Sequence, residues 1–342
     1  MELISFDEAY RRASGLSQNL PSLLLGNGFS IAFDPSIFTY DALLQMTDFS
    51  SDPTAKDAFA ALSTKDFEEV IRSLDIGSTL TKNYLPYGPE IADRMRVDSE
   101  FLKQALISAI LKRHPAHIFK IPAGCYNSTA RFITKFSEVF TVNYDLLLYW
   151  TLINSQALRS CRDGFRESEF TSGIYEWRDT SRDSPGWREN LHFLHGGLHL
   201  FERNGILSKV TYSVTSGHLI EQIKMNIEQG SVPLFVCEGT SEEKLDQIQR
   251  HTYLRYCLSR FGKAGPVLFT FGISFSLADE HIVDRIFNRS FQHLYVGVFG
   301  DPDNDGNTGL RSKLIERASA SGIDVEFYAS GSIGLWEDSI NQ

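Results

Sequence analysis

The hydrophobic positions of the chain fall into short continuous runs separated by polar residues. Continuous apolar runs of this length are typical of parallel strands that are buried on both faces. Most runs are followed closely by Gly, Asn, His or Asp, which are common where a strand ends in a loop. The expected strands are Leu23–Leu25, Val139–Val142, Leu191–Leu194, Leu234–Cys237, Val267–Phe271, Leu294–Phe299 and Val325–Tyr328.

Between the last runs, apolar residues recur with helical spacing. Ala278–Phe287 and Leu310–Ala320 each follow an expected strand. Alternation of strand and helix indicates a doubly wound sheet. The sequence therefore predicts an α/β fold with a Rossmann-like doubly wound, mostly parallel sheet, whose ligand lies beyond the carboxyl ends of the strands.

A long stretch between the first two expected strands has mainly helical patterns. Asp66–Leu74 and Ser99–Lys112 show helical spacing, and Ser99 is expected to cap the second helix. We therefore expect a helical module at residues 41–137, inserted within a single α/β domain that spans residues 1–342. The polar stretch Arg159–Asn190 is expected to form a long surface excursion.

Composition narrows the class of protein. Hydrophobic residues make up 42% and charged residues 22% of 342 residues, which is ordinary for a globular protein and excludes disorder. A formal net charge of −10 argues against direct nucleic-acid binding. No apolar run approaches the roughly 18 residues of a membrane helix, and the N-terminus lacks a signal-peptide layout. We expect a cytoplasmic protein that binds neither membrane nor nucleic acid.

The cysteines and histidines bear on metal binding. The cysteines form no CxxC pair, so we expect reduced thiols and no structural zinc. Three histidines, His192, His195 and His199, lie close together in sequence. However, His192 and His195 face opposite ways on an extended strand, so we expect no metal there. The cysteines are Cys125, Cys161, Cys237 and Cys257.

A glycine loop follows the first expected strand. Gly26-Asn27-Gly28 leads into Phe29 and Ser30. Glycines allow backbone N–H groups to approach a phosphate closely. A third glycine would complete the dehydrogenase fingerprint, but Ile31 stands at that position. The loop therefore favours phosphate binding over hydride transfer, although a plain strand-to-helix turn would look the same.

Polar residues follow two further strands. Asn143 and Asp145 come after Val139–Val142, and His195 ends the strand that precedes Gly196. A histidine at a strand end can face a cleft as a general base. The alternatives are a helix cap at Asn143 and Asp145 and a packed histidine at His195.

Two later expected strands, Val267–Phe271 and Leu294–Phe299, carry similar ends. Gly272 and Ser274 follow one strand, in a small-residue loop suited to a phosphate or ribose. Asp301 follows the next strand, where an acid can bind a ribose hydroxyl. Each feature taken singly also fits a routine strand-to-helix turn.

In their order along the chain, these motifs resemble the sirtuin superfamily. The correspondence covers about residues 21–301 of the chain. The stretch PLFVCEGTSEEKLDQI further resembles a bacterial family of uncharacterised proteins with a sirtuin-like core. The matching motifs are Gly26-Asn27-Gly28-Phe29-Ser30, Thr141-Val142-Asn143-Tyr144-Asp145, His195-Gly196 and Gly272-Ile273-Ser274.

The resemblance implies NAD as the ligand. Two departures weigh against protein deacylation: the four-cysteine zinc module of sirtuin deacylases is missing, and Val142 replaces a motif glutamine. Zinc-less sirtuin-like proteins of bacteria are typically NAD hydrolases in antiviral defence. This similarity implies cleavage of NAD, as substrate, to nicotinamide and ADP-ribose.

The resemblance also implies roles for individual residues. Catalysis would fall to Asn143 and His195, with Asp145 orienting the loop or a ribose hydroxyl. The Gly26–Ser30 loop would hold the diphosphate, and Asp34 would lie near the nicotinamide. Ser274 and Asp301, with Gly272, would contact the adenosine half.

The sequence does not specify how the activity is regulated, and it is compatible with other functions. An unrestrained NAD hydrolase would exhaust its host, so we expect gating by homo-oligomerisation, a partner ATPase or a phage-derived activator. The alternatives are a sensor that binds NAD or ADP-ribose without turnover, a zinc-less sirtuin deacylase, and another kind of α/β phosphate-binding enzyme.

Overall fold

A six-stranded parallel sheet forms the centre of the computed structural model. The model describes residues 3–155, 161–169, 171–179, 189–203, 205–211, 218–237 and 240–338. Every pairing in this sheet is parallel, as the continuous apolar runs predict. Its strands are β1 (Ser22–Leu25), β2 (Glu138–Thr141), β5 (Leu191–Phe193), β9 (Val267–Phe271), β10 (His293–Val298) and β11 (Asp324–Ala329).

The order of these strands places a switch point at the centre of the sheet. The order is β11-β10-β9-β1-β2-β5. The chain therefore builds outward from β1 through β2 to β5, then returns to β9 on the other side of β1. Sheets that bind dinucleotides have this order, and their ligand lies in the crevice where the direction reverses. Here that crevice lies beyond the carboxyl ends of β1 and β9.

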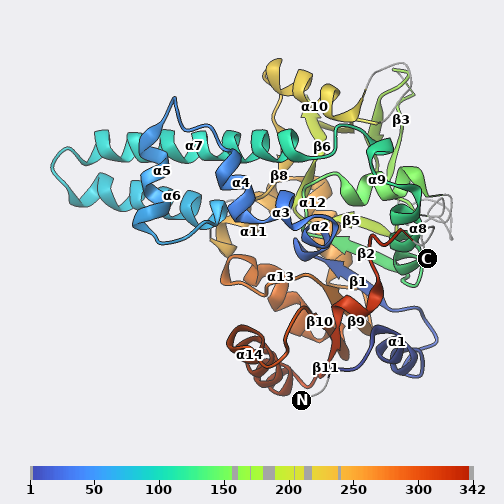
Figure 1. The fold of residues 1–342 in the computed structure, drawn as a ribbon. Helices are drawn as coiled ribbons and strands as arrows, with labels where there is room; N and C mark the ends of the chain where they lie inside the picture. Colours follow the sequence, from blue (N-terminus) through green and yellow to red (C-terminus); the bar gives the residue numbers. More distant parts are fainter. Residues whose placement is uncertain are drawn as a thin grey trace.

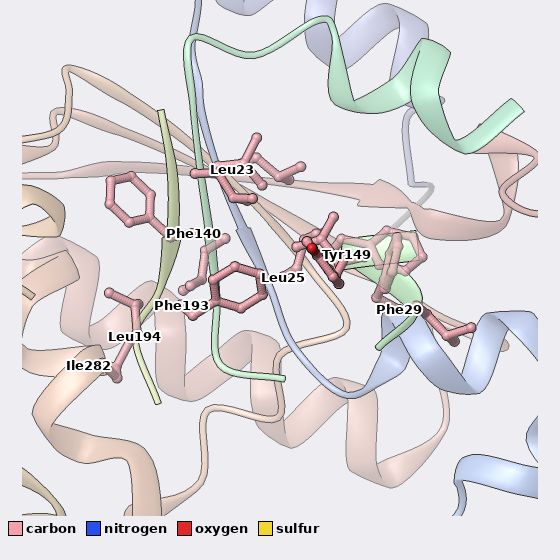
Figure 2. Close-up of a cluster of buried hydrophobic side chains, with 14 of the residues drawn as sticks. Leu23, Leu25, Phe29, Phe140, Tyr149, Phe193, Leu194 and Ile282 are labelled. Atoms are coloured by element: carbon pink, nitrogen blue, oxygen red, sulfur yellow. The ribbon is translucent and has the colours of Figure 1, made fainter. Parts of the chain in front are cut away.

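Helices cover both faces of the sheet, which confirms the predicted doubly wound arrangement. Leu24 is in register with Phe140, whereas Leu23 is in register with Phe269, so these two aromatic rings lie on opposite faces. The Phe269 ring packs on Phe6 of α1 (Phe6–Ser14), with centroids 5.8 Å apart. The Phe140 ring packs on α12 (Thr252–Phe261). Figure 2 shows part of this core, with Leu23 and Phe140 from neighbouring strands.

The chain between β1 and β2 is helical in the structure. Within the expected module at 41–137, α6 starts directly after Asp66, whose carboxylate accepts hydrogen bonds from the N–H groups of Glu68 and Glu69. The expected start at Ser99 is wrong, because one long helix runs through this buried residue. The helices are α2 (Gly28–Phe33), α3 (Pro35–Phe38), α4 (Tyr40–Met46), α5 (Pro53–Ala61), α6 (Phe67–Tyr84), α7 (Gly88–Arg113), η1 (Ile118–Lys120) and α8 (Ala123–Ile133).

The helical module has two parts with different surroundings. The helices α6 and α7 pack side by side as a long hairpin that reaches beyond the sheet (Figure 1). The N-terminal end of α6 lies at the cavity described below, to which it contributes Glu68, Glu69 and Arg72. The helical module therefore supplies a wall of the cavity as well as its own hairpin.

A second sheet, which the sequence did not predict, is antiparallel. It has the order β3-β4-β7-β6-β8. The run Leu234–Cys237 was expected in the parallel sheet, but β8 pairs antiparallel with β6 instead. The described part of Arg159–Asn190 is not only surface loop, because it supplies β3 and β4. The strands are β3 (Phe165–Glu167), β4 (Tyr175–Trp177), β6 (Gly196–Arg203), β7 (Ile206–Lys209) and β8 (Pro233–Phe235).

The remaining helices connect these strands. The expected helices after β9 and β10 are present as α13 with η4, and as α14. Within the described residues, no helix combines the length and apolarity needed to cross a membrane. The bounds are α9 (Leu147–Asn154), α10 (Leu219–Glu228), α11 (Ser241–Arg250), η3 (Leu277–Asp279), α13 (Glu280–Arg285), η4 (Ile286–Ser290), α14 (Asp305–Ser321) and η5 (Ser330–Ile333).

Candidate functional site

The ends of four parallel strands are level with one another. Leu25 of β1 is in register with Thr141 of β2 and with Phe271 of β9, and Thr141 is in register with Phe193 of β5. The residues that follow these strands therefore meet at one edge of the sheet. Because all four strands are parallel, this edge is the carboxyl edge at which ligands bind in such sheets.

A cavity of about 740 Å³ lies at this edge. Its volume falls within the roughly 300–1,000 Å³ of small-molecule sites. The lining includes eight residues that the sequence singled out, from four different strand ends. These are Gly26, Asn27, Gly28, Asn143, Asp145, His195, Gly272 and Ser274.

The glycines bring the loops after β1 and β9 into direct contact. The N–H of Gly28 donates to the carbonyl of Gly272 over 3.0 Å, and the N–H of Gly26 donates to that of Phe271 over 2.9 Å. A Cβ on Gly28 would lie 2.5 Å from the Cα of Gly272, closer than any side chain permits. These two N–H groups are thus paired within the protein, and the glycines serve close packing of the loops.

Ser30, Asn143 and Asp145 form what we call the strand-end network. The Asn143 Nδ2 donates to Ser30 Oγ over 3.1 Å, and Ser30 Oγ donates to Asp145 Oδ2. The second oxygen of Asp145 accepts the N–H of Leu147 over 2.8 Å, at the start of α9. Burial raises the pKa of Asp145, and its hydrogen bonds with Ser30 and Leu147 oppose that rise. The network joins α2, which follows β1, to the residues that follow β2, and it holds Asn143 at the cavity wall.

His195 faces a second histidine. Its Nε2 lies 3.0 Å from Nε2 of His281, and both rings are 3% exposed. On its other side, Nδ1 of His281 lies 3.1 Å from Ser241 Oγ. Burial lowers the pKa of His195 to about 4 and that of His281 to about 2. Both imidazoles are therefore neutral at pH 7, so each ring has one unprotonated nitrogen.

A buried lysine lies between two carboxylates beside these histidines. Nζ of Lys244, a residue 1% exposed, lies 2.8 Å from Glu68 Oε2 and 3.1 Å from Asp279 Oδ1. Burial lowers the pKa of Lys244, but both carboxylates outweigh this and raise it above its usual value. Burial raises the pKa of Glu68 to about 7, against the opposing effect of Lys244.

The residues around this lysine and the two histidines form one unit, which we call the histidine–carboxylate cluster. It draws its members from α6, the end of β5, α11, η3 and α13. Its members are Glu68, His195, Ser241, Lys244, Asp279 and His281.

The cavity is predominantly acidic. Among the described lining residues, Arg72 carries the one full positive charge, and its Nε has no hydrogen-bond partner within the described part of the chain. The acidic lining residues are Asp66, Glu68, Glu69, Asp145 and Asp279. This balance suits a ligand whose reacting end is cationic, with Arg72 available to an anionic group.

Four of the singled-out residues do not line the cavity. Phe29 is fully buried against Trp336, and Ser30 is buried within the strand-end network. Asp34 caps α3 by accepting the N–H of Ser36. Asp301 is exposed and accepts the N–H of Asp303 within its own loop. Their assignment to NAD contacts stays a prediction, and the structure gives each of them another role.

The two other clustered histidines are packing residues, as the geometry of a strand suggests. His192 stacks on Phe140 with ring centroids 4.8 Å apart, and His199 stacks on Tyr149 at 4.4 Å. Within the described residues the four cysteines are unpaired.

Sequence reasoning missed five members of the histidine–carboxylate cluster. A signal existed for two of them, because Asp279 and His281 open the helix directly after the loop that contains Ser274. That loop lies at the ligand edge, so polar residues immediately after it were candidates. Glu68, Ser241 and Lys244 lie on helices far away in sequence, where they look like ordinary surface positions.

Comparison with known proteins gives a family and distant structural relatives. Residues 23–336 match the family model described as "Domain of unknown function (DUF4917)". No curated protein matches the sequence.

Solved structures similar to this chain include several Sir2 proteins. Sir2Tm bound to a propionylated peptide is 12% identical, with 93% of this chain and 100% of that chain covered and a TM-score of 0.33. A Sir2 homologue in complex with NAD is 13% identical, with 99% and 94% covered and a TM-score of 0.36. A mutant Sir2 homologue in complex with ADP-ribose is 14% identical, with 92% and 98% covered and a TM-score of 0.33. Overlaps of this size carry no information about activity.

Proposed function

The chain belongs to the DUF4917 family, whose model matches residues 23–336, and we propose that it hydrolyses NAD to nicotinamide and ADP-ribose. One observation carries this proposal. Asn143 and His195 follow neighbouring parallel strands and line one cavity at the switch point of the sheet. Dinucleotides bind at this point in sheets of the same strand order.

The charge of the cavity fits the bond that would break. In NAD the nicotinamide ring is cationic, so it leaves as a neutral molecule with the electron pair of the C–N bond. Positive charge then develops on the ribose, as in other glycosidic cleavages. The carboxylates of Glu68 and Asp279 line the cavity beside His195 and would stabilise this charge.

Water completes the reaction. Its oxygen forms a bond with the ribose carbon that nicotinamide leaves, and its proton passes to an unprotonated nitrogen of His195. Asn143 has its amide nitrogen engaged by Ser30, which leaves the amide oxygen to position the water or a ribose hydroxyl. Arg72, one turn of α6 beyond Glu68, is the lining cation for the diphosphate, and Ser274 offers a hydroxyl.

We further propose that this activity belongs to a regulated antiviral defence effector. The antiviral role is what the resemblance to zinc-less sirtuin-like proteins implies. The observation that supports regulation is that Nε2 of His195 already faces His281 at 3.0 Å. That nitrogen must be released before it can accept a proton from water. Homo-oligomerisation, a partner ATPase or a phage-derived activator could supply the movement, and each can be added to the purified protein in turn.

Incubation with NAD tests the proposal directly. We expect nicotinamide and ADP-ribose in equal amounts by chromatography, from the protein alone or with an activator, and neither product from Asn143→Ala. Binding of NAD without turnover under every condition would identify a sensor instead. Nicotinamide release that requires an acylated lysine peptide would identify a deacylase. Either result would contradict hydrolysis.

A further inference from the structure

Two imidazoles and a carboxylate converge at the edge of the cavity. The Nε2 atoms of His195 and His281 lie 3.0 Å apart. One ring nitrogen from each histidine and one carboxylate oxygen of Asp279 all lie within 4.8 Å of one another. Two imidazole nitrogens on one tetrahedral zinc, each about 2.0–2.1 Å from the metal, are separated by about 3.3 Å. The two nitrogens are therefore already spaced almost as a metal would hold them.

The charge around these groups is unbalanced in favour of a cation. Lys244 is the ion-pair partner of both Glu68 and Asp279. One ammonium lies between two carboxylates, so one negative charge is in excess once Glu68 is ionised, which requires a pH above its raised pKa of about 7. Buried charges need a partner. A divalent cation beside Asp279 would be the partner of that carboxylate, while Lys244 would stay paired with Glu68.

The second nitrogen of His281 has the support that metal-bound histidines usually have. Nδ1 of His281 lies 3.1 Å from Ser241 Oγ, which also accepts the backbone N–H of His281 over 2.6 Å. A hydroxyl oxygen has two lone pairs, so it can accept both donors. Donation from Nδ1 fixes the tautomer in which Nε2 is free to bind a metal.

We propose that His195, His281 and Asp279 bind a divalent transition-metal ion such as Zn²⁺, and that the bound ion blocks His195. Two histidines and one carboxylate with an open position are the ligands of catalytic zinc and of non-haem iron sites. His195 and Asp279 line the cavity, so the open position faces it. This set differs from the three neighbouring histidines of the sequence, because His281 comes from another element.

Titration of the full-length protein with zinc tests the site. After dialysis against a chelator, isothermal titration calorimetry with Zn²⁺ should give one ion per chain. His281→Gln and Asp279→Asn should each weaken binding by more than about tenfold, and Ser241→Ala by about 10–100-fold. The matched control is His251→Gln. His251 also pairs with a carboxylate, Glu202, at 2.8 Å but lies away from the cavity, so its loss should leave the affinity unchanged.

Thermal melting and the absorption spectrum of bound Co²⁺ test the same site independently of calorimetry. Zn²⁺ should raise the melting temperature of the wild type and of His251→Gln, but not of His281→Gln. Co²⁺ in place of Zn²⁺ should give visible absorption bands that disappear in Asp279→Asn. Absence of binding to the wild type, or equal affinity in His281→Gln and the wild type, would overturn the site.

The inhibitory part rests on the proposed hydrolysis of NAD and has its own readout. One equivalent of Zn²⁺ should stop cleavage by the wild type, and a chelator should restore it. Unchanged cleavage by the zinc-loaded protein would show that His195 is not blocked. If the metal-free protein cleaves no NAD either alone or with any of the activators, the hydrolase proposal fails, whereas calorimetry still decides the metal site.

Discussion

The strand-end network and the histidine–carboxylate cluster lie on the same cavity but are built in different ways. The network joins Ser30 to Asn143 and Asp145, which follow two neighbouring strands of one sheet. Its hydrogen bonds close within the network and at the start of α9. The cluster instead brings together residues from α6, the end of β5, α11, η3 and α13, and holds a buried ammonium between two carboxylates that are mostly buried at the cavity wall.

This difference means that the strand-end network is already formed by the sheet and its loops, whereas the histidine–carboxylate cluster forms only when α6 is packed against the rest of the site. The network depends on the register of β1 and β2 and on α2, which follows β1 directly. The cluster depends on α6 staying against the loop after β9, because Lys244 reaches Glu68 on one side and Asp279 on the other. A movement of the helical module would therefore change the cluster and leave the network intact.

The largest expected effect tests whether both parts take part in catalysis. His195→Ala and Asn143→Ala should each lower the turnover of NAD by about 10²–10⁴-fold, because one removes the proposed base and the other the group that positions water. NAD affinity should change much less than turnover. Turnover and binding are measured separately on the activated protein.

His251→Gln serves as the control for this pair and should turn over NAD like the wild type. Wild-type turnover in His195→Ala would remove the cluster from the mechanism. Wild-type turnover in Asn143→Ala would reduce the network to a structural role.

The next effect concerns the stability of the cluster. Lys244→Met leaves Glu68 and Asp279 without their buried cation, and breaking a buried ion pair in this way costs about 3–5 kcal/mol of the free energy of unfolding. Urea denaturation measures the loss. Lys263→Met, at an exposed lysine, should change stability by less than about 0.5 kcal/mol. Equal stabilities for the two variants would show that the cluster contributes nothing to folding.

The same difference decides what the sequence could predict. Apolar runs specified the parallel strands, and the residues directly after them gave Asn143, Asp145 and His195, because a strand end is visible in one local segment. The antiparallel sheet was not predicted, because a short apolar run such as Leu234–Cys237 is compatible with a parallel or an antiparallel strand. Its polar, irregular partner strands gave no periodic signal.

The cluster could not be predicted because its contacts are tertiary. Lys244 and Glu68 are separated by 176 positions, about half of the chain, and each belongs to an amphipathic helix on which a charged residue is expected at the surface. Only the docking of α6 and α11 around the loop after β9 buries them. For the same reason the pairing of His195 with His281 had no local signature.

A smaller effect tests the close packing on which the network side depends. Gly28→Ala places a Cβ 2.5 Å from the backbone of Gly272, so the loops after β1 and β9 must separate. Overpacking of this kind costs about 1–3 kcal/mol, and thermal melting should show the loss. Gly309→Ala is the matched control, because its Cβ meets nothing within 4 Å in α14. There, the higher helix propensity of alanine should stabilise by up to about 1 kcal/mol, and a similar gain at Gly28 would contradict the tight contact.

The last effect, which is small for each single step of pH, is a pH dependence that belongs to the cluster. The pKa of Glu68 is raised by burial from 4.5 to about 7, with Lys244 opposing and Asp279 and Asp66 adding to the rise. Between these two values the folded protein holds a proton that the unfolded chain has released. The free energy of unfolding should therefore fall as pH rises through this window, by at most about 1.4 kcal/mol per pH unit.

Comparison with a variant isolates this contribution from other titrations. The pKa values of buried histidines such as His195 and His281 are lowered in the folded protein. Their contribution to the free energy of unfolding therefore rises with pH, because the unfolded chain holds protons that the folded protein does not. They are common to wild type and Glu68→Gln, so the difference between the two proteins in urea at pH 5, 6 and 7 reports Glu68 alone. That difference should grow steadily with pH, because glutamine keeps the neutral form that burial favours. Glu316→Gln, at an exposed glutamate of α14, should show no such trend. A difference between wild type and Glu68→Gln that stays constant with pH would mean that Lys244 keeps Glu68 ionised throughout, and the cluster would then be as fully paired as the strand-end network.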